Sequence, residues 1–316
     1  MGLTNFPNGI ASFGIPSFGS GSGVPVSTGN YFFVDSGTGI NQVGCGTRET
    51  PFATIDYAIG QCTASKGDVI IVMPGHTETI TGAGGITLDV AGVSIVGLGN
   101  GALRPTITYT TAATGTFAIT AANCLVKNLI FNANYADVAT AVIVSGVNNR
   151  IEGCLFKEQT TNMNFLNCFR TGAVANGADG LEIVNNVRIS IDAAALAFVS
   201  ILEATNRLLI SGNFDNQASA ADVGHFITMG AFVCLGARIF ANILNLTGDN
   251  NAQTVGVFMT GSSTSSTGVV AYNLCGDLDT TTELFDTATL DFQHFENYKT
   301  GTIATSGRIT PAMEGA

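Results

Sequence analysis

A short apolar pattern centred on Gly or Asn recurs along the chain and constrains its fold more than any other feature. The central residues are 25 to 32 positions apart, at Gly97, Asn128, Gly153, Asn185, Gly212, Asn242 and Asn273. This step is shorter than a propeller blade, which takes about 40–45 residues, and longer than a hexapeptide-type coil. It suits one turn of a parallel β-helix, in which three short strands are joined by loops of varying length.

The repeated Gly or Asn has a physical reason at a corner between two sheets. Such a corner needs a residue with positive φ, which Gly adopts freely and Asn tolerates. Stacked Asn side chains also share amide hydrogen bonds between neighbouring chain segments. We therefore expect the seven residues to align along one edge of a solenoid. An antiparallel sandwich is the alternative, but the chain has few two-residue hairpin signals and no long alternation of apolar and polar residues.

The segment from Pro51 to Ile80 predicts how the solenoid begins. A helix is expected at about 51–64, with Thr50 as its N-cap and Pro51 at its first position. Apolar residues at helical spacing give this helix one apolar face, made of Phe52, Ile55, Ala58, Ile59 and Cys62. We expect this face to cover the open end of the solenoid, which would otherwise expose its core and its strand edges. Strands are expected at 31–34, before the helix, and at 69–73, after it.

The chain divides into three parts by composition. Residues 1–30 form an extended arm rich in Gly, Ser and Pro, which cannot bury enough surface to fold alone. Residues 31–298 form the β-helix, and residues 299–316 form a C-terminal tail. The isolated apolar residues of the arm are expected to dock either onto a neighbouring protein or onto the chain's own solenoid; they are Phe6, Phe13 and Phe18.

Composition and charge exclude several classes of function. The net charge of −11 and the absence of a Lys/Arg run argue against nucleic-acid binding. The longest apolar-rich run, residues 226–236, is too short to span a bilayer. Seven cysteines without a C-x-x-C pair exclude the usual zinc and redox motifs. We interpret them as reduced core residues of a protein assembled in a reducing cytoplasm.

No catalytic, cofactor-binding or metal-binding site is predicted. Glycoside hydrolysis needs two carboxylates about 5–10 Å apart. The close pair Asp277 and Asp279 lies in a polar turn and is interpreted as solvated surface. A lyase would need an Arg or Lys base and a carboxylate cluster for calcium. Four arginines recur near the repeats without such a cluster and are expected at the solvated or interface surface: Arg150, Arg188, Arg207 and Arg238. His76 is interpreted as a turn residue, and His225 and His294 as isolated.

Three stretches resemble the entry of right-handed β-helix proteins of the pectate-lyase-like superfamily: residues 31–39 (YFFVDSGTG), 50–55 (TPFATI) and 67–75 (GDVIIVMPG). The resemblance implies an all-β, right-handed parallel β-helix with a short capping helix at its N-terminal end. The arm joined to this entry looks like uncharacterised structural proteins of tailed bacteriophages. The catalytic motifs of polygalacturonases and pectate lyases are missing, so no catalytic residue carries over.

The resemblance implies a non-enzymatic virion protein, either a capsid decoration (cement) protein or a head fibre on the capsid exterior. Its expected partner is the major capsid protein, onto which the arm could lace. A homotrimer assembled in the bacterial cytoplasm is expected, without nucleic acid, membrane or cofactor. The alternative is a tailspike-like or secreted β-helix protein that binds or degrades a polysaccharide.

Overall fold

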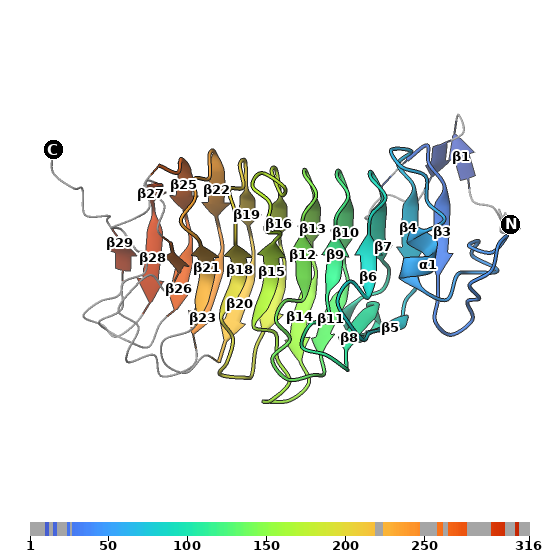
Figure 1. Cartoon of the computed structure of the whole chain (residues 1–316), viewed down its shortest axis with the longest axis horizontal. Coiled ribbons are helices and arrows are strands. Elements are labelled where there is room, and N and C mark those ends of the chain that lie inside the picture. Colours follow the sequence, from blue (N-terminus) through green and yellow to red (C-terminus); the bar gives the residue numbers. More distant parts are fainter. Residues whose placement is uncertain are drawn as a thin grey trace, which may run out of the picture.

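A computed structural model describes residues 10–12, 15–17, 24–25, 27–218, 224–246, 258–261, 265–276, 292–300 and 307–309. Within these residues the chain winds into a parallel β-solenoid with three sheets, in which β3 (Tyr31–Val34) and β28 (Asn297–Thr300) lie towards opposite ends of the rod (Figure 1). The predicted fold class, a right-handed parallel β-helix with a short N-terminal helix, is confirmed. Seven successive coils contribute one strand to each sheet.

The first sheet, called sheet 1, starts at the N-terminal end of the rod. Its ten strands are β3 (Tyr31–Val34), β4 (Val69–Val72), β7 (Ser94–Gly97), β10 (Leu125–Lys127), β13 (Arg150–Glu152), β16 (Glu182–Val184), β19 (Leu209–Ser211), β22 (Ala237–Phe240), β25 (Gly268–Ala271) and β27 (Gln293–Phe295). All neighbours in this sheet pair in parallel. The two strands expected at 31–34 and 69–73 are its first members, β3 and β4.

Sheet 2 also has ten strands, and sheet 3 has seven. Sheet 2 contains β5 (Thr77–Ile80), β8 (Thr106–Tyr109), β11 (Ile130–Ala133), β14 (Leu155–Glu158), β17 (Val187–Ile189), β20 (Phe214–Gln217), β23 (Ile243–Leu246), β26 (Leu274–Gly276), β28 (Asn297–Thr300) and β29 (Gly307–Ile309). Sheet 3 contains β6 (Ile86–Leu88), β9 (Phe117–Ile119), β12 (Val142–Val144), β15 (Asn167–Thr171), β18 (Ala197–Ile201), β21 (His225–Met229) and β24 (Met259–Thr260). Only β29 pairs antiparallel in these sheets, within the described part of the chain.

The interior is filled by apolar side chains that stack from coil to coil. One run of rings lies under sheet 3, where Phe198 and Phe226 stack at a centroid distance of 5.2 Å. Phe226 and Phe258 follow at 4.9 Å. Offset or tilted aromatic pairs at such distances contribute beyond their buried area, by about 0.5–1.5 kcal/mol each. Because each coil contacts mainly its neighbours, the rod is stabilised coil by coil.

At the corner between sheets 1 and 2, the observed column of residues differs from the predicted alignment of Gly and Asn. The strand register places five of the seven predicted residues in one column, from Gly97 to Gly212. At the next coils, however, Ala241 and Tyr272 occupy this column, with φ of 55° and 56°. Asn242 and Asn273 lie one residue further along. The alignment was therefore wrong by one residue at the last two positions.

The shifted asparagines belong to a second, buried column. In this Asn ladder each backbone N–H of one coil donates to the side-chain oxygen of the Asn in the next coil, at 2.9–3.1 Å. Its members are Asn186, Asn213, Asn242, Asn273 and Asn297, and none is more than 2% exposed. A shared ladder between coils was expected, but at the corner itself. The ladder sits one position later because only there does the side chain point into the core.

A second corner, between sheets 3 and 1, has a column of its own. Residues with positive φ recur five positions before those of the first corner: Asn123, Asn148, Gly180, Arg207 and Gly236. Each sheet 1 strand from β10 to β22 therefore lies between two left-handed residues at a fixed spacing. The varying loop lengths between coils consequently fall on the sheet 2 and sheet 3 side of the solenoid.

The N-terminal helix α1 (Ile55–Ile59) is shorter than the predicted 51–64. Its N-cap is Thr54, whose side chain accepts from the Tyr57 N–H, so Thr50 is not the cap and Pro51 is not in the helix. The reason is that Phe52 exchanges backbone hydrogen bonds with β3, at 2.8 and 2.9 Å, which holds this stretch extended. A short 3₁₀ helix, η1, follows later at Gly101–Leu103.

Helix α1 covers the open end of the rod as expected. It packs against β3, β4 and β6, and buries Ile55, Ala58 and Ile59. Two carboxylates connect it to the first strands of sheets 2 and 3. Glu78 of β5 accepts from the Ile55 N–H at 2.8 Å, and Asp56 accepts from the Thr87 N–H of β6 at 3.2 Å. The helix thus satisfies the Thr87 N–H at the edge of sheet 3, and Glu78 satisfies an N–H in the first turn of the helix.

The described parts of the two terminal segments contain strands. Strands β1 (Ile10–Ser12) and β2 (Ile15–Ser17) form an antiparallel pair within the predicted arm. Nearer the body, the Ser27 hydroxyl donates to the Gly67 carbonyl and the Asn30 N–H to Asp68. At the other end, β28 continues to Thr300 and β29 pairs back onto it, so strands extend past the predicted boundary at 298.

All seven cysteines are free thiols, and five are buried. Burial raises the pKa of Cys154 to about 12, so its thiol stays protonated at neutral pH. The interpretation as unpaired core cysteines is confirmed for these five, whereas Cys45 and Cys62 are half-buried. In the described part of the chain, no helix has the length and apolarity to cross a membrane.

Candidate functional site: a groove on the outer face of sheet 3

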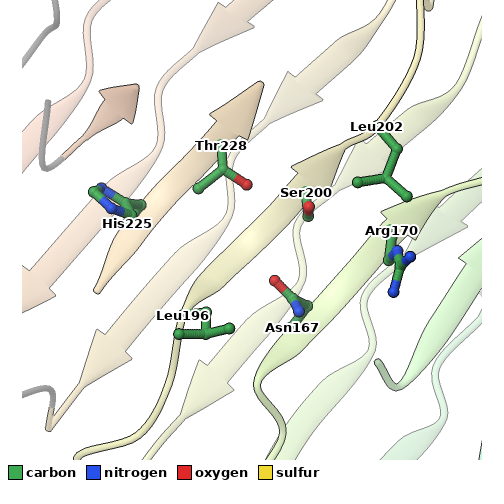
Figure 2. A pocket seen from close by; sticks show the side chains of 7 residues that line it. All are labelled: Asn167, Arg170, Leu196, Ser200, Leu202, His225 and Thr228. Atoms are coloured by element: carbon green, nitrogen blue, oxygen red, sulfur yellow. The ribbon is translucent and has the colours of Figure 1, made fainter. Parts of the chain in front are cut away.

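An open groove of about 360 Å³ lies on the outer face of sheet 3. Three neighbouring strands and the two residues that flank β18 supply its lining, as Figure 2 shows, with Asn167, Arg170, Leu196, Ser200, Leu202, His225 and Thr228. Arg170, Ser200 and Thr228 occupy the same register position on β15, β18 and β21. Neighbouring strands are about 4.8 Å apart, so polar groups recur along the groove at roughly that interval.

Arg170 is the charged group of the groove. Within the described residues its guanidinium makes no hydrogen bond and no ion pair, although it is only partly exposed. A guanidinium presents up to five donors in a rigid fork that matches a carboxylate or phosphate. Among the residues that the structure describes, no Asp or Glu lines the groove. Arg170 therefore carries a positive charge that no described lining residue compensates, on a chain whose net charge is −11.

The other lining residues combine hydrogen-bonding groups with two apolar side chains. Asn167 uses its amide nitrogen to donate to the Ala139 carbonyl at 2.9 Å, which fixes the amide's orientation. Ser200 and Thr228 add hydroxyls, and Leu196 and Leu202 add apolar surface. A combination of a few convergent polar groups with apolar surface is typical of sites that bind small molecules.

A buried polar cluster lies beneath the groove and holds two of its strands. Arg188 donates to both carboxylate oxygens of Asp215, at 2.5 and 2.7 Å, and to the Ala197 carbonyl at 3.1 Å. Gln217 donates to Asp215 at 2.6 Å and to the His225 carbonyl at 2.9 Å. Ala197 and His225 are the paired first residues of β18 and β21. The cluster thus fixes the backbone at one end of the groove.

The environment of Arg188 keeps it charged. Burial alone would lower the pKa of this guanidinium, but the charge of Asp215 and its hydrogen bonds raise the pKa above its ordinary value. The guanidinium carbon also lies 5.7 Å from the centre of the Phe198 ring. Arg188 is 1% exposed, so the expectation of a solvated or interface residue was wrong for it. Its inward direction follows from its place between Val187 and Ile189, whose side chains face outward.

The remaining predicted residues are placed as follows. Arg207 and Arg238 are exposed, and Arg150 is partly exposed and paired with Glu152 and Glu182. His76 is fully buried and contacts Glu78 at 3.2 Å, so it belongs to the end that α1 covers. His294 faces the interior of sheet 1, where burial lowers its pKa. Phe6, Phe13, Phe18, Asp277 and Asp279 lie outside the described residues.

The structure brings His225 into the groove, whereas the sequence indicated an isolated histidine. Sequence analysis missed the groove altogether, including Arg170. The signal was weak, since Arg170, Ser200 and Thr228 are far apart in sequence and share only their position within the coil. Aligning the coils on the sheet 1 corners would not have revealed that shared position, because the loops between these corners and sheet 3 differ in length from coil to coil. Among the described residues, no group of His, Cys, Asp and Glu could hold a metal ion.

Comparisons with known proteins give structural neighbours only. No protein-family model and no curated protein matches the sequence. A rhamnogalacturonan lyase is similar over 90% of this chain and 90% of its own, with 13% identity and a TM-score of 0.49. The ORF18 protein of Geobacillus virus E2 is similar over 85% of this chain and 61% of its own, with 12% identity and a TM-score of 0.32. Scores this low do not bear on function.

Proposed function

We propose that the protein is a non-enzymatic structural protein of a bacteriophage particle, which decorates the capsid exterior as a cement or head-fibre protein and binds a saccharide in the sheet 3 groove. The observation that carries the binding role is the described lining of the groove, which combines hydroxyls and an amide with a guanidinium that has no partner among the described residues, and which includes no described carboxylate. Glycoside hydrolysis uses two carboxylates, so the lining supports binding without hydrolysis.

The chemistry of the groove favours a saccharide that carries a carboxylate. A carboxylate binds a guanidinium through two parallel hydrogen bonds, which are stronger than bonds between neutral groups. Ser200, Thr228 and Asn167 would bond hydroxyls of neighbouring sugar units, and Leu196 and Leu202 would pack against the apolar faces of the rings. Because Arg170 is the charged member of this set, it would set the preference for an acidic over a neutral chain.

Attachment to the particle is assigned to the arm. The resemblance of the arm and entry segment to phage structural proteins supports this role, with Phe6, Phe13 and Phe18 docking onto the major capsid protein. Free thiols are consistent with assembly in the bacterial cytoplasm before release. A truncation that tests the arm should remove residues 1–23 and keep Ser27 and Asn30, because these two bond the body of the solenoid.

Two measurements test the proposal. The first is calorimetric titration with oligosaccharides that carry carboxylates, against uncharged ones of the same length; binding of the acidic series alone is expected, and it is lost in Arg170→Ala. The second is imaging of particles mixed with full-length and truncated protein, where only the full-length chain should decorate the capsid. Full decoration by the truncated chain would contradict the role of the arm, and equal binding of both saccharide series would contradict the role of Arg170.

A degrading enzyme, secreted or part of a tailspike, is the second candidate. It is favoured by the presence of both Arg170 and His225 in one groove, since a histidine can transfer a proton and a guanidinium can hold a carboxylate of the substrate. Release of reducing ends or unsaturated uronides from acidic polysaccharides separates the two candidates. Steady turnover that disappears in Arg170→Ala would establish the enzyme, and saturable binding without product would support the structural protein.

A further inference from the structure

A loop near the start of the rod covers the corner between sheets 1 and 2 and bonds to several coils. Between β10 and β11 this corner takes only residues 128–129, whereas between β7 and β8 it takes residues 98–105. We call residues 98–105 the strap, and they include η1. Hydrogen bonds of 2.8–3.1 Å join the strap to the corners of three other coils, in the pairs Gly75 with Leu103, Asn128 with Gly99, and Gly153 with Arg104. The strap therefore connects four successive coils.

The exposed tip of the strap is the dipeptide Asn100–Gly101. The Gly101 N–H donates to the side-chain oxygen of Asn100 at 3.0 Å, and it makes no other hydrogen bond within the described part of the chain. Gly101 has a φ of 55°, and a Cβ added there would meet no atom within 4 Å. The backbone nitrogen of Gly101 thus lies beside the side-chain amide of Asn100, in open solvent. Holding two reacting groups in contact raises the rate of their reaction.

A second Asn–Gly dipeptide of the described residues, Asn176–Gly177, has its groups held by bonds to other residues. The Gly177 N–H donates to the Val174 carbonyl at 3.0 Å, and the Asn176 side-chain oxygen accepts from the Asn206 amide at 2.8 Å. Both dipeptides are followed by alanine, so their local sequences match. They differ in their hydrogen bonds, because the two groups are fixed elsewhere at Asn176 and contact each other at Asn100.

We propose that Asn100 is a site of spontaneous deamidation, in which the backbone nitrogen of Gly101 is the nucleophile. After this nitrogen gives its proton to hydroxide, it attacks the side-chain amide carbon of Asn100 and forms a new C–N bond. The bond from that carbon to the side-chain nitrogen breaks, the nitrogen takes a proton from water, and ammonia leaves. Water then adds to one of the two carbonyl carbons of the cyclic imide and opens the ring, which leaves a carboxylate and a proton. The product is aspartate or isoaspartate, and no atom is oxidised or reduced.

The modification changes the strap in two ways. Either product carries a new carboxylate, on a chain whose net charge is already −11. Isoaspartate also places a side-chain carbon in the main chain, so the cap that Asn100 provides for η1 is lost and the strap loosens. Aspartate keeps its cap oxygen in place. The inference goes beyond the proposed function and does not depend on it.

Peptide mapping by mass spectrometry tests the site in the full-length protein, folded and in urea, during incubation in mildly alkaline buffer. In the folded protein Asn100 should deamidate at least about tenfold faster than Asn176, because the bonds at Asn176 and Gly177 must first break. In urea the two rates should become similar, since the dipeptides match in sequence. Equal rates in the folded protein overturn the proposal. A difference that persists in urea also overturns it, because the folded geometry is then not its cause.

A second measurement follows the consequence for the strap. Ion-exchange chromatography separates the modified protein, and hydrogen exchange is measured at the Gly75 amide, which donates to the Leu103 carbonyl. This amide should exchange at least about tenfold faster in the isoaspartyl fraction than in the unmodified protein, and at the unmodified rate in Asn100→Asp. The Asn213 amide of the ladder is the control and should exchange equally slowly in all samples. Unchanged exchange at Gly75 in the isoaspartyl fraction would overturn the loosening of the strap.

Discussion

The corner that carries the Asn ladder and the groove on sheet 3 are built by the same stacking of coils. They differ in their polar groups, which are bonded to one another in the ladder and open to solvent in the groove. At the ladder, Asn242 accepts two hydrogen bonds through its side-chain oxygen and donates two through its nitrogen. In the groove, Arg170 has no partner among the described residues. The ladder groups are buried and bonded to one another, so they are structural, whereas the partly exposed Arg170 is open to solvent or to a ligand.

The largest loss of stability is expected at the buried ion pair beneath the groove, formed by Arg188 and Asp215. Arg188→Met would leave the Asp215 carboxylate buried without its partner, and breaking one side of a buried ion pair costs about 3–5 kcal/mol. Urea or thermal unfolding should therefore show a large loss of stability. Arg188→Met/Asp215→Leu should recover most of it, because an apolar pair of similar volume leaves no unpaired charge. Equal losses in the single and double variants would contradict this account of the cluster.

A smaller loss is expected at the ladder. Asn242→Ala would remove the acceptor of the Asn213 backbone N–H and leave buried groups unsatisfied, with a loss of about 2–3 kcal/mol in the free energy of unfolding. The control is Asn162→Ala, whose exposed side chain makes no hydrogen bond among the described residues, and which should change stability by less than about 0.5 kcal/mol. Similar values for the two variants would show that the ladder does not stabilise the rod.

In the groove, an alanine substitution should change the affinity for the ligand and leave the free energy of unfolding unchanged. Arg170→Ala should lower affinity for a carboxylated oligosaccharide at least tenfold, because a hydrogen bond to a charged group contributes about 1.5–3 kcal/mol. Its unfolding free energy should stay within about 0.5 kcal/mol of wild type. Arg238→Ala, exposed on sheet 1, is the control and should change neither quantity. A stability loss in Arg170→Ala without a binding loss would assign Arg170 to the structure.

The smallest effect is expected at the ion pairs on the outer face of sheet 1, which are satisfied but exposed. Burial raises the pKa of Glu152, but the hydrogen bonds and charges of Arg150 and Lys127 outweigh it and lower the pKa below its ordinary value. A lowered carboxylate pKa gives stability that is present above the unfolded value and is lost as pH falls through the folded one. Glu152→Gln should therefore flatten the loss of stability below about pH 4.5, by less than about 1 kcal/mol.

The repeat could be read from the sequence because its corner residues are chemically restricted. Gly153 and Gly212 take positive φ without strain, and Asn128 and Asn185 tolerate it. The prediction failed at Ala241 and Tyr272, which occupy the same corner although neither favours positive φ. There the strand pairing on both sides of the corner outweighs the local preference. The sequence contained a signal that could have located the corners. Asn123 and Asn128 lie five residues apart, and so do Gly180 and Asn185, which marks the two ends of each sheet 1 strand.

The start of helix α1 and the groove could not be predicted from the sequence, for a different reason. Thr54, not Thr50, caps α1 because Phe52 pairs with β3, a contact between segments that no local propensity encodes. Likewise, Arg170 and Arg188 are both arginines of short strands, and their local sequences do not tell which one faces outward. Only the register of each coil places Arg188 in the core and Arg170 in the groove.

Backbone amide hydrogen exchange with and without an acidic oligosaccharide compares the two regions in a single experiment. The ladder amides, such as those of Asn213 and Asn242, should exchange slowly in both conditions, because each is bonded to the Asn of the next coil. Strands β15, β18 and β21 should slow on addition of the oligosaccharide in the wild type and stay unchanged in Arg170→Ala. Protection that appears along the ladder instead, or that leaves sheet 3 unaffected, would contradict the assignment of the corner to structure and the groove to binding.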